Sequence, residues 1–542
     1  MTSNTEKASS SLASAEADEK ALQNELHGED GFNYITGWTL HLITIGMALS
    51  TFLVNLEITI VSTSLVSITN ELHDFGGSSW IVTAYLITYT GGLVIWAKLS
   101  DLLGRKPIFV ASLTIFCAFS GGCGAAQTMN QLIVCRAFQG IGGGGIYALI
   151  MVMLYELVPP PRYPLYAALL TIMVASSFAL GPIFGGLILQ RASWRWVFLL
   201  NVPAAALAAG IILVAVPRDF PNQGKTRTQI PLRGLAVADI TGSVLMVSAL
   251  ALLIVAFEEA AINLSWAIPT FIGPLCASVI TLVAFLASQR YASRPSSIVE
   301  PVLPWRFCQS RLIMGLLSSS FMTGAVSITC IIQIPIRYQT AIGGSPLQAG
   351  IRVIPIAVSA PLGTMITAIL LKNRRVPPLY LSLVGQLLQI VGLVFLSQGS
   401  PNDPDWPGLY GIEVIIGLGM GCNIGTAALL TPWTVEKRDI AVGSAAVTQF
   451  RFLGSAIVVA IITAVGNSWV KNALLERLTP LQVSTIFRST EAISDLPEDA
   501  EVFVRSIFIQ SFNLQMRIVL GFSVAGMFTW LLMWQKTQIR VP

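Results

Sequence analysis

Long apolar runs alternate with short polar segments from about residue 38 to the C-terminus. A helix needs roughly 20 apolar residues to cross the hydrocarbon core of a bilayer, and about fourteen runs meet that length. None shows the alternation over about ten residues that barrel strands have, so only helices fit. The pattern predicts an all-α integral membrane protein with spans near 38–66, 79–100, 107–126, 130–157, 163–189, 196–216, 235–257, 267–287, 312–337, 347–371, 378–397, 408–430, 441–466 and 514–534.

Composition agrees with lipid as the main solvent of this chain. Apolar residues make up 54% of the 542 residues and charged residues only 11%, whereas a soluble domain carries about 25% charged residues. The net charge of +4 is small, and the basic residues form no cluster with interleaved aromatics. Composition therefore argues against nucleic acid as a partner.

The distribution of Lys and Arg predicts the orientation. One set of loops, with the C-terminus, holds about nineteen of these residues and the opposite set about six. Basic residues are retained on the cytosolic side. Both termini are therefore predicted to be cytosolic, which requires an even number of spans.

Polar segments divide the chain into four parts. Residues 1–36 form an acidic tail without an apolar segment typical of a signal peptide, and we predict that the tail is disordered and cytosolic. Residues 37–217 make a six-helix bundle, 218–311 a linker with two extra spans, and 312–542 a second six-helix bundle. Within the last part, 467–513 is predicted to be a long outer loop, whose amphipathic stretch from Glu501 to Asn513 lies on the membrane surface.

Two charged residues lie well inside predicted spans. Glu57 is in the first span and Arg136 in the fourth. At 1.5 Å per residue they lie roughly 13 and 9 Å below the outer edge, so they can pair. An intramembrane carboxylate is a functional candidate by default, and we predict that Glu57 carries protons with Arg136 as its counter-charge. Desolvation favours the neutral acid and pairing favours the charged form.

Charge and glycine patterns predict where helices move. Asp101, Gly104 and Arg105 lie in a charged turn between the second and third spans, where Arg105 can pair with a carboxylate and Asp101 with a helix N-terminus, as a cytosolic latch. Small residues allow close helix contact, and proline bends a helix. The positions with these properties in the fourth and fifth spans are Gly140, Gly181, Pro182, Gly185 and Gly186.

Other polar residues within or near spans either line a cavity or bridge helices. These are Asn55, Gln139, Gln333, Asn423, Gln449 and Arg451. Asp239, Glu258 and Glu259 flank the seventh span and are predicted to be interfacial, and Glu413 lies a few residues inside the twelfth. Asn263 begins a weak glycosylation sequon that lies close to the membrane.

These motifs together resemble the major facilitator superfamily, and within it the fourteen-helix drug:proton antiporters such as fungal toxin and multidrug efflux pumps. The resemblance rests on 97–106, on Arg136, Gln139 and Gly140, on Gly181 to Gly186, on 194–203 and on 56–61. Glu57 stands where aspartate is usual, and Ala97 where glycine is usual. The resemblance implies two six-helix bundles with two inserted helices, alternating access, and proton influx that drives export.

The sequence thus predicts a monomeric, proton-coupled exporter of small amphipathic molecules in the plasma membrane, with the vacuolar membrane as the alternative. An importer of siderophores or vacuolar basic amino acids, and a non-transporting sensor, remain open alternatives. His27, His41 and His73 all lie in tails or at span edges. We therefore expect no enzyme activity, metal or cofactor.

Overall fold

The computed structural model describes residues 35, 37–75, 77–158, 163–217, 220, 239–263, 268–294, 297, 299, 301–371, 376–400, 407–436, 440–535 and 538–539. Each predicted span coincides with a helix, or in one case with two consecutive helices. Thirteen spans in the described part are long and apolar enough to cross a membrane. Helix α3 (Ser78–Leu103), which is not among these, has 26 residues and packs against α5.

The first half of the chain forms a bundle around α2, whose most apolar window is 72% buried. Gly104, with φ of 97°, is the single residue between α3 and α4, and this left-handed conformation explains why glycine occupies the turn. The helices of this half are α2 (Gly37–Leu72), α3 (Ser78–Leu103), α4 (Arg105–Ala125), α5 (Met129–Leu157), α6 (Tyr163–Arg191), α7 (Arg195–Leu199) and α8 (Asn201–Ala215).

The second half is built in the same way around α12, whose apolar window is 83% buried. A short helix, α11 (Trp305–Gln309), precedes it, and a π-turn, η3 (Tyr338–Ile342), follows it. The long helices of this half are α12 (Arg311–Arg337), α13 (Pro346–Leu371), α14 (Pro378–Leu396), α15 (Leu409–Thr434), α16 (Ile440–Leu474) and α18 (Glu498–Met533).

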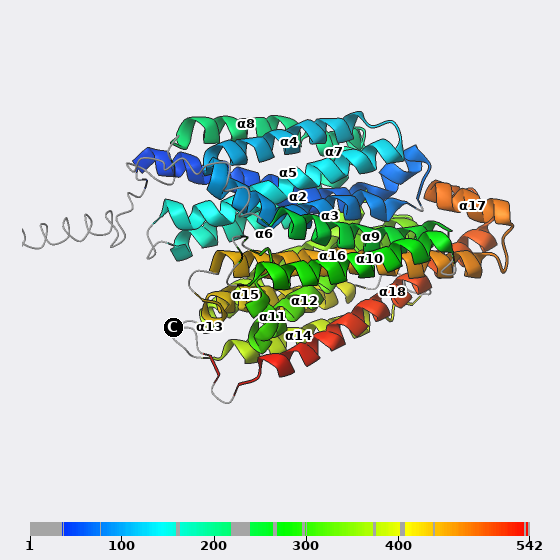
Figure 1. The fold of residues 1–542 in the computed structure, drawn as a ribbon. Helices are drawn as coiled ribbons and strands as arrows, with labels where there is room; N and C mark the ends of the chain where they lie inside the picture. The colour runs from blue at the N-terminus through cyan, green and yellow to red at the C-terminus, as the bar shows by residue number, and fades with distance from the viewer. Residues whose placement is uncertain are drawn as a thin grey trace, which may run out of the picture.

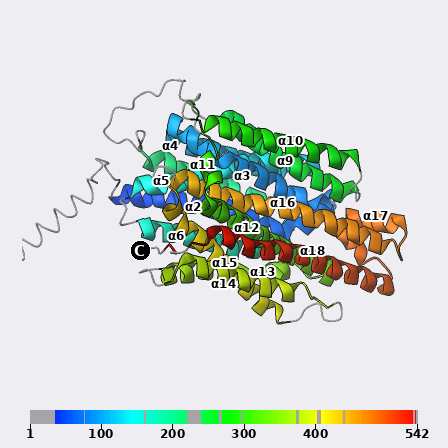
Figure 2. The same cartoon turned by 60° about the horizontal axis from the view of Figure 1, so that its bottom comes forward.

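Two further helices, α9 (Ile240–Asn263) and α10 (Pro269–Ala292), connect the halves in sequence. They lie along one edge of the molecule, opposite α13 and α14 (Figure 2). Only 11% of the apolar window of α10 is buried, whereas α9 packs against α3 and α16. The pair is therefore peripheral, but its inner helix contacts both halves.

The predicted outer loop is largely helical. Helix α16 continues to Leu474, and α17 (Pro480–Arg488) and the 3₁₀ turn η6 (Thr490–Ile493) follow it. The stretch from Glu501 to Asn513 is the beginning of α18 and is not a separate surface helix, because Val504 and Ile507 pack with Val483 and Ile486 of α17. Helix α17 projects beyond the spans at one end of the molecule (Figure 1). We call this end the α17 end, and the opposite end, where α3 turns into α4, the Gly104 end.

The two halves are joined by hydrogen bonds at the α17 end. The Phe75 N–H donates to the Phe487 carbonyl (3.1 Å), and Gln339 Nε2 donates to the Thr63 carbonyl (3.1 Å). Asn70 Oδ1 accepts from both the N–H (3.0 Å) and the hydroxyl (3.2 Å) of Thr490. These bonds close the α17 end between the bundles.

Candidate functional site: a buried ion pair and an aromatic stack

The predicted pairing of Glu57 with Arg136 is present in the structure. Glu57 lies in the middle of α2 and is 0% exposed, and Arg136 of α5 is 1% exposed. Arg136 Nη1 donates to one carboxylate oxygen, and Asn201 Nδ2 from the start of α8 donates to the other. Three helices of the first half thus converge on one carboxylate.

Two further hydrogen bonds hold the Arg136 guanidinium. Its Nε donates to the Ile81 carbonyl (2.9 Å), and its Nη1 to Gln139 Oε1 (2.7 Å). Gln139 Nε2 in turn donates to Ser120 Oγ (2.8 Å). A buried ion pair is tolerated when hydrogen bonds satisfy both partners, and removal of one partner costs about 3–5 kcal/mol because the other charge is left unpaired. The network is therefore matched to an ionised Glu57, and any proton that binds there must loosen it.

An aromatic stack connects this network to the second half. The Arg136 guanidinium lies 4.4 Å from the centre of the Tyr85 ring. Tyr85 stacks on Tyr89 (5.6 Å between centroids), and Tyr89 meets Phe452 of α16 edge-on (4.9 Å). Arg451 lies 5.1 Å from the Phe452 ring. Cation–π and aromatic contacts each contribute about 0.5–2 kcal/mol. A continuous chain of such contacts therefore runs from Arg136 to α16.

The six candidate cavity residues have different surroundings. Gln333 lines a cavity, described below, and Gln449 Nε2 donates to the Thr90 carbonyl of the other half (3.2 Å). Gln139 belongs to the Arg136 network. Asn55 bonds to the Thr51 carbonyl of its own helix (2.8 Å), and Asn423 bonds to neighbours within its half. Arg451 lies at the end of the stack.

The turn at the Gly104 end contains an ion pair. Arg105 binds Glu156 at the end of α5 (2.6 Å), and its Nη1 donates to Ser100 Oγ (2.6 Å). Arg105 thus finds the carboxylate that the latch prediction requires, although the sequence did not indicate which one. The side chain of Asp101 lies outside the described residues, as does the corresponding basic loop of the second half, 372–375.

The glycines of α6 lie where backbones come closest. A Cβ at Gly181 would stand 2.0 Å from Thr59 Oγ1, and one at Gly185 2.2 Å from Thr63 Oγ1, both on α2. A Cβ at Gly186 would stand 2.4 Å from Leu347 Cα of α13, and one at Gly350 of that helix would stand 2.3 Å from the Pro182 carbonyl oxygen. Helix α6 is therefore in close contact with both halves at once.

Three acidic residues have surroundings that the sequence did not predict. Glu258, predicted to be interfacial, is 0% exposed, because its position on α9 faces α3. Asp239 is also buried and accepts from Gln289 Nε2 (2.5 Å). Glu413 on α15 is 3% exposed and lies in the field of Arg352 and Arg337. The acid of the second half is thus on its fourth helix, and the two arginines that act on it are on α13 and α12.

Asn201 is the main residue that sequence reasoning missed. It stands in the segment 194–203 that carries part of the family resemblance, but it was not singled out as a ligand of Glu57. The side chain of Asn263, which ends α9, and the next two residues of its sequon lie outside the described part.

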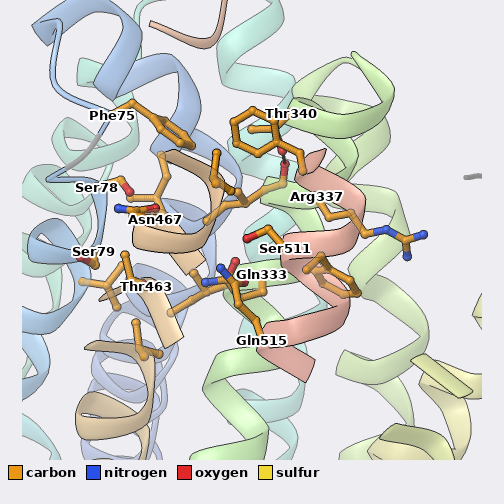
Figure 3. A pocket seen from close by; sticks show the side chains of 18 residues that line it. Phe75, Ser78, Ser79, Gln333, Arg337, Thr340, Thr463, Asn467, Ser511 and Gln515 are labelled. Carbon is orange, nitrogen blue, oxygen red and sulfur yellow. Dashed lines mark hydrogen bonds between the residues drawn. The ribbon is translucent and has the colours of Figure 1, made fainter. Parts of the chain in front are cut away.

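A small polar cavity lies between the halves beneath the α17 end (Figure 3). Its volume is about 50 Å³, enough for a few water molecules. The polar side chains around it come from α3, α12, α16 and α18, and Phe75 stands at its edge. They include Ser78, Ser79, Gln333, Thr463, Asn467, Ser511 and Gln515.

Two helical bundles, one of which encloses a buried ion pair, are typical of a membrane transporter. Residues 47–459, more than half of the chain, match the family model described as Major Facilitator Superfamily. The protein belongs to the Major Facilitator Superfamily.

Curated relatives match along most of the chain. An MFS-type transporter, FPY5, from Fusarium mangiferae is 38% identical over 94% of this chain and 86% of its own length. The efflux pump dotC from Dothistroma septosporum is 27% identical over 92% and 84%. Multidrug resistance protein 3 from Bacillus subtilis is 27% identical over 86% and 87%.

Solved structures share the fold. A bacterial homologue of the human lysosomal transporter Spinster, inward-facing and unoccupied, aligns with a TM-score of 0.66 at 15% identity over 93% of this chain and all of that chain. The xylose transporter XylE from E. coli, partially occluded and inward open, aligns with a TM-score of 0.55 at 12% identity over 90% and 98%.

Proposed function

We propose that this transporter is a proton-coupled antiporter that exports small amphipathic organic molecules by alternating access. The observation that carries the proposal is the Glu57 carboxylate, held by Arg136 and Asn201 in the core of the first half. Protonation of Glu57 removes the charge that holds Arg136, and an unpaired buried arginine is strongly unfavourable. The bundle must then rearrange, which couples the proton to a conformational change.

The aromatic stack transmits this conformational change to the second half. When Arg136 shifts, its contact with Tyr85 changes, and the stack transmits that change through Tyr89 to Phe452 on α16. Gln449, about one turn away on α16, donates to the Thr90 carbonyl of α3. Alternating access therefore requires that one contact near the middle of the interface between the halves breaks, together with several at the α17 end.

Charge and relatives support direction and substrate class. The excess of Lys and Arg in the loops at the Gly104 end places this end in the cytosol, with both termini, and the α17 end outside. Curated relatives are named efflux pumps and a multidrug resistance protein. We propose the plasma membrane as the location, a monomer as the working unit, and no cofactor.

The test is reconstitution in liposomes that contain the pH indicator pyranine, with rhodamine 6G as an amphipathic probe. Under an imposed pH gradient, rhodamine is expected to move against the flow of protons. A proton flux without rhodamine but with arginine or a ferric siderophore, in the same direction as the protons, would support the importer alternative. If no probe moves in either direction, the transporter proposal is wrong and the sensor alternative gains support.

The bonds at the α17 end make a separate prediction. Asn70→Ala removes the acceptor of two hydrogen bonds from Thr490. Since the two bonds together contribute about 1–3 kcal/mol, the open population should rise at least about fivefold. The measurement is the rate at which an impermeant maleimide labels an Asn467→Cys variant, in a background without other cysteines, because Asn467 lines the cavity.

The matched control is Asn513→Ala. Asn513 also makes two hydrogen bonds at the α17 end, but both go to Gly399 within the second half. Labelling should not change in this control. Equal rates for Asn70→Ala and the parent protein would show that these bonds do not hold the α17 end closed.

A further inference from the structure

Glu258 is a buried acid that has no cationic partner among the residues that the structure describes. It lies on α9, the inner helix of the inserted pair, and is 0% exposed. Ser79 Oγ donates to one carboxylate oxygen (2.5 Å), and Thr83 Oγ1 donates to the other (3.3 Å). Ser79 and Thr83 are four residues apart on α3 and so project from the same face of that helix. The site is thus built between an inserted helix and the first bundle.

The elements packed around Glu258 offer it no charge. Helix α3 faces it with the two hydroxyls, and no charged side chain among the described residues acts on it. Two residues along α9, Ala260 packs with Ala464 of α16 and with Phe271 of α10. The ionisable groups of these elements near the same end are Glu259, which is partly exposed, Cys276 on α10, which is exposed, and Lys471 on α16, which is partly exposed. This site therefore lacks what stabilises the ionised Glu57.

The two hydroxyls suit both protonation states of the acid. A Ser or Thr hydroxyl has one donor and two acceptor positions, so it can donate to a carboxylate or accept from a carboxyl O–H. A buried carboxylate without a cation is strongly disfavoured against its neutral form. The same two side chains can therefore keep the site bonded while a proton binds and leaves.

Ser79 connects this site to the cavity beneath the α17 end. Ser78 and Ser79 both line the cavity, together with polar side chains of α16 and α18 (Figure 3). The cavity volume of about 50 Å³ is large enough for a few water molecules. A proton carried by such a water would be one hydroxyl, that of Ser79, away from Glu258.

Helix α3 also connects Glu258 to the ion pair. The Ile81 carbonyl, midway in sequence between Ser79 and Thr83, accepts the Nε–H of Arg136. A residue two positions along a helix projects to nearly the opposite side. Glu258 and the Glu57–Arg136 network therefore both contact the same turn of α3.

We propose that Glu258 is a second proton-binding site, loaded through Ser79 from the cavity at the α17 end and coupled to the Glu57 network through α3. This inference rests on the proposed antiport function. It assigns the inserted pair of helices a part in energy coupling, in addition to its contacts with both bundles.

The first test does not depend on transport. Infrared difference spectra of the purified protein between acidic and alkaline buffer should contain a carboxyl C=O band that is absent in Glu258→Gln and present in Glu57→Gln and in the control Glu259→Gln. Persistence of that band in Glu258→Gln would overturn the proposal, even if the protein exchanges no protons for substrate.

The second test measures protons per rhodamine 6G in pyranine-loaded liposomes. In Glu258→Gln one of two carriers is lost, so this ratio should fall roughly twofold, while transport persists. An unchanged ratio would overturn the proposal. If Glu258→Gln does not fold, Ser79→Ala keeps the acid and removes its link to the cavity. The C=O band should then persist while proton binding slows, and an unchanged rate contradicts loading through Ser79.

Discussion

Replacement of Glu57 by glutamine should abolish proton-driven transport, with a decrease of at least about tenfold in the initial rate of rhodamine 6G accumulation. Glutamine keeps the size of the side chain but has no exchangeable proton at this position. It also leaves the buried Arg136 without a counter-charge, at a cost of about 3–5 kcal/mol. Passive exchange of rhodamine 6G across liposomes without a pH gradient should be retained, because that step needs no proton.

Two companion variants sharpen this result. Glu57→Asp restores an acid that is one methylene shorter and should recover part of the coupling, which a merely structural role for the glutamate does not predict. Glu71→Gln is the matched control on the same helix, where the acid pairs with Arg195 near the surface (2.5 Å). Such exposed pairs contribute about 0–1 kcal/mol. Wild-type coupling in Glu57→Gln would disprove its role as a carrier.

Replacement of Gly140 by alanine should strongly destabilise the fold. Its Cβ would stand 2.2 Å from Thr88 Oγ1 and 2.3 Å from the Tyr85 carbonyl oxygen, which belongs to the backbone of α3 and cannot rotate away. Overpacking of this kind costs about 1–3 kcal/mol or more. The measurement is the thermal midpoint and the monodisperse yield of the detergent-purified protein.

The control for this variant is Gly210→Ala on α8, where the added Cβ meets no heavy atom within 4 Å. Alanine favours a helix over glycine by about 1 kcal/mol, so this control should be neutral or slightly stabilising. Opposite signs for the same substitution in two helices test the close approach of α3 and α5 directly. Equal effects would show that the contact is not tight.

The spans and the ion pair were predictable because both depend on depth in the membrane. Hydropathy over about 20 residues locates a span, and distances along the chain place Glu57 and Arg136 at similar depths. The ligand Asn201 was not predictable, because it stands at the boundary between two short helices, where an amide is unremarkable. Which face of a helix a residue occupies depends on packing, and for this reason Glu258 was misplaced.

The same limit explains the other differences. The polar start of α18 was interpreted as a surface segment, because a sequence does not show that α17 covers it outside the lipid. Asn55 and Asn423 were equally plausible as cavity residues until the structure placed each within its own half. The position of Glu413 relative to Arg352 and Arg337 depends on how α12, α13 and α15 pack, which a degenerate repeat does not reveal.

Helix α17 belongs to the second half, but its Phe487 and the following Thr490 bond to Phe75 and Asn70 of the first half. When those bonds break, the underside of α17 and of the turn after it becomes an epitope that is hidden in the closed arrangement. An antibody fragment that recognises this underside would therefore trap the protein with its α17 end open. In the orientation that we propose, such a reagent would inhibit transport from outside the cell without entering the substrate pathway.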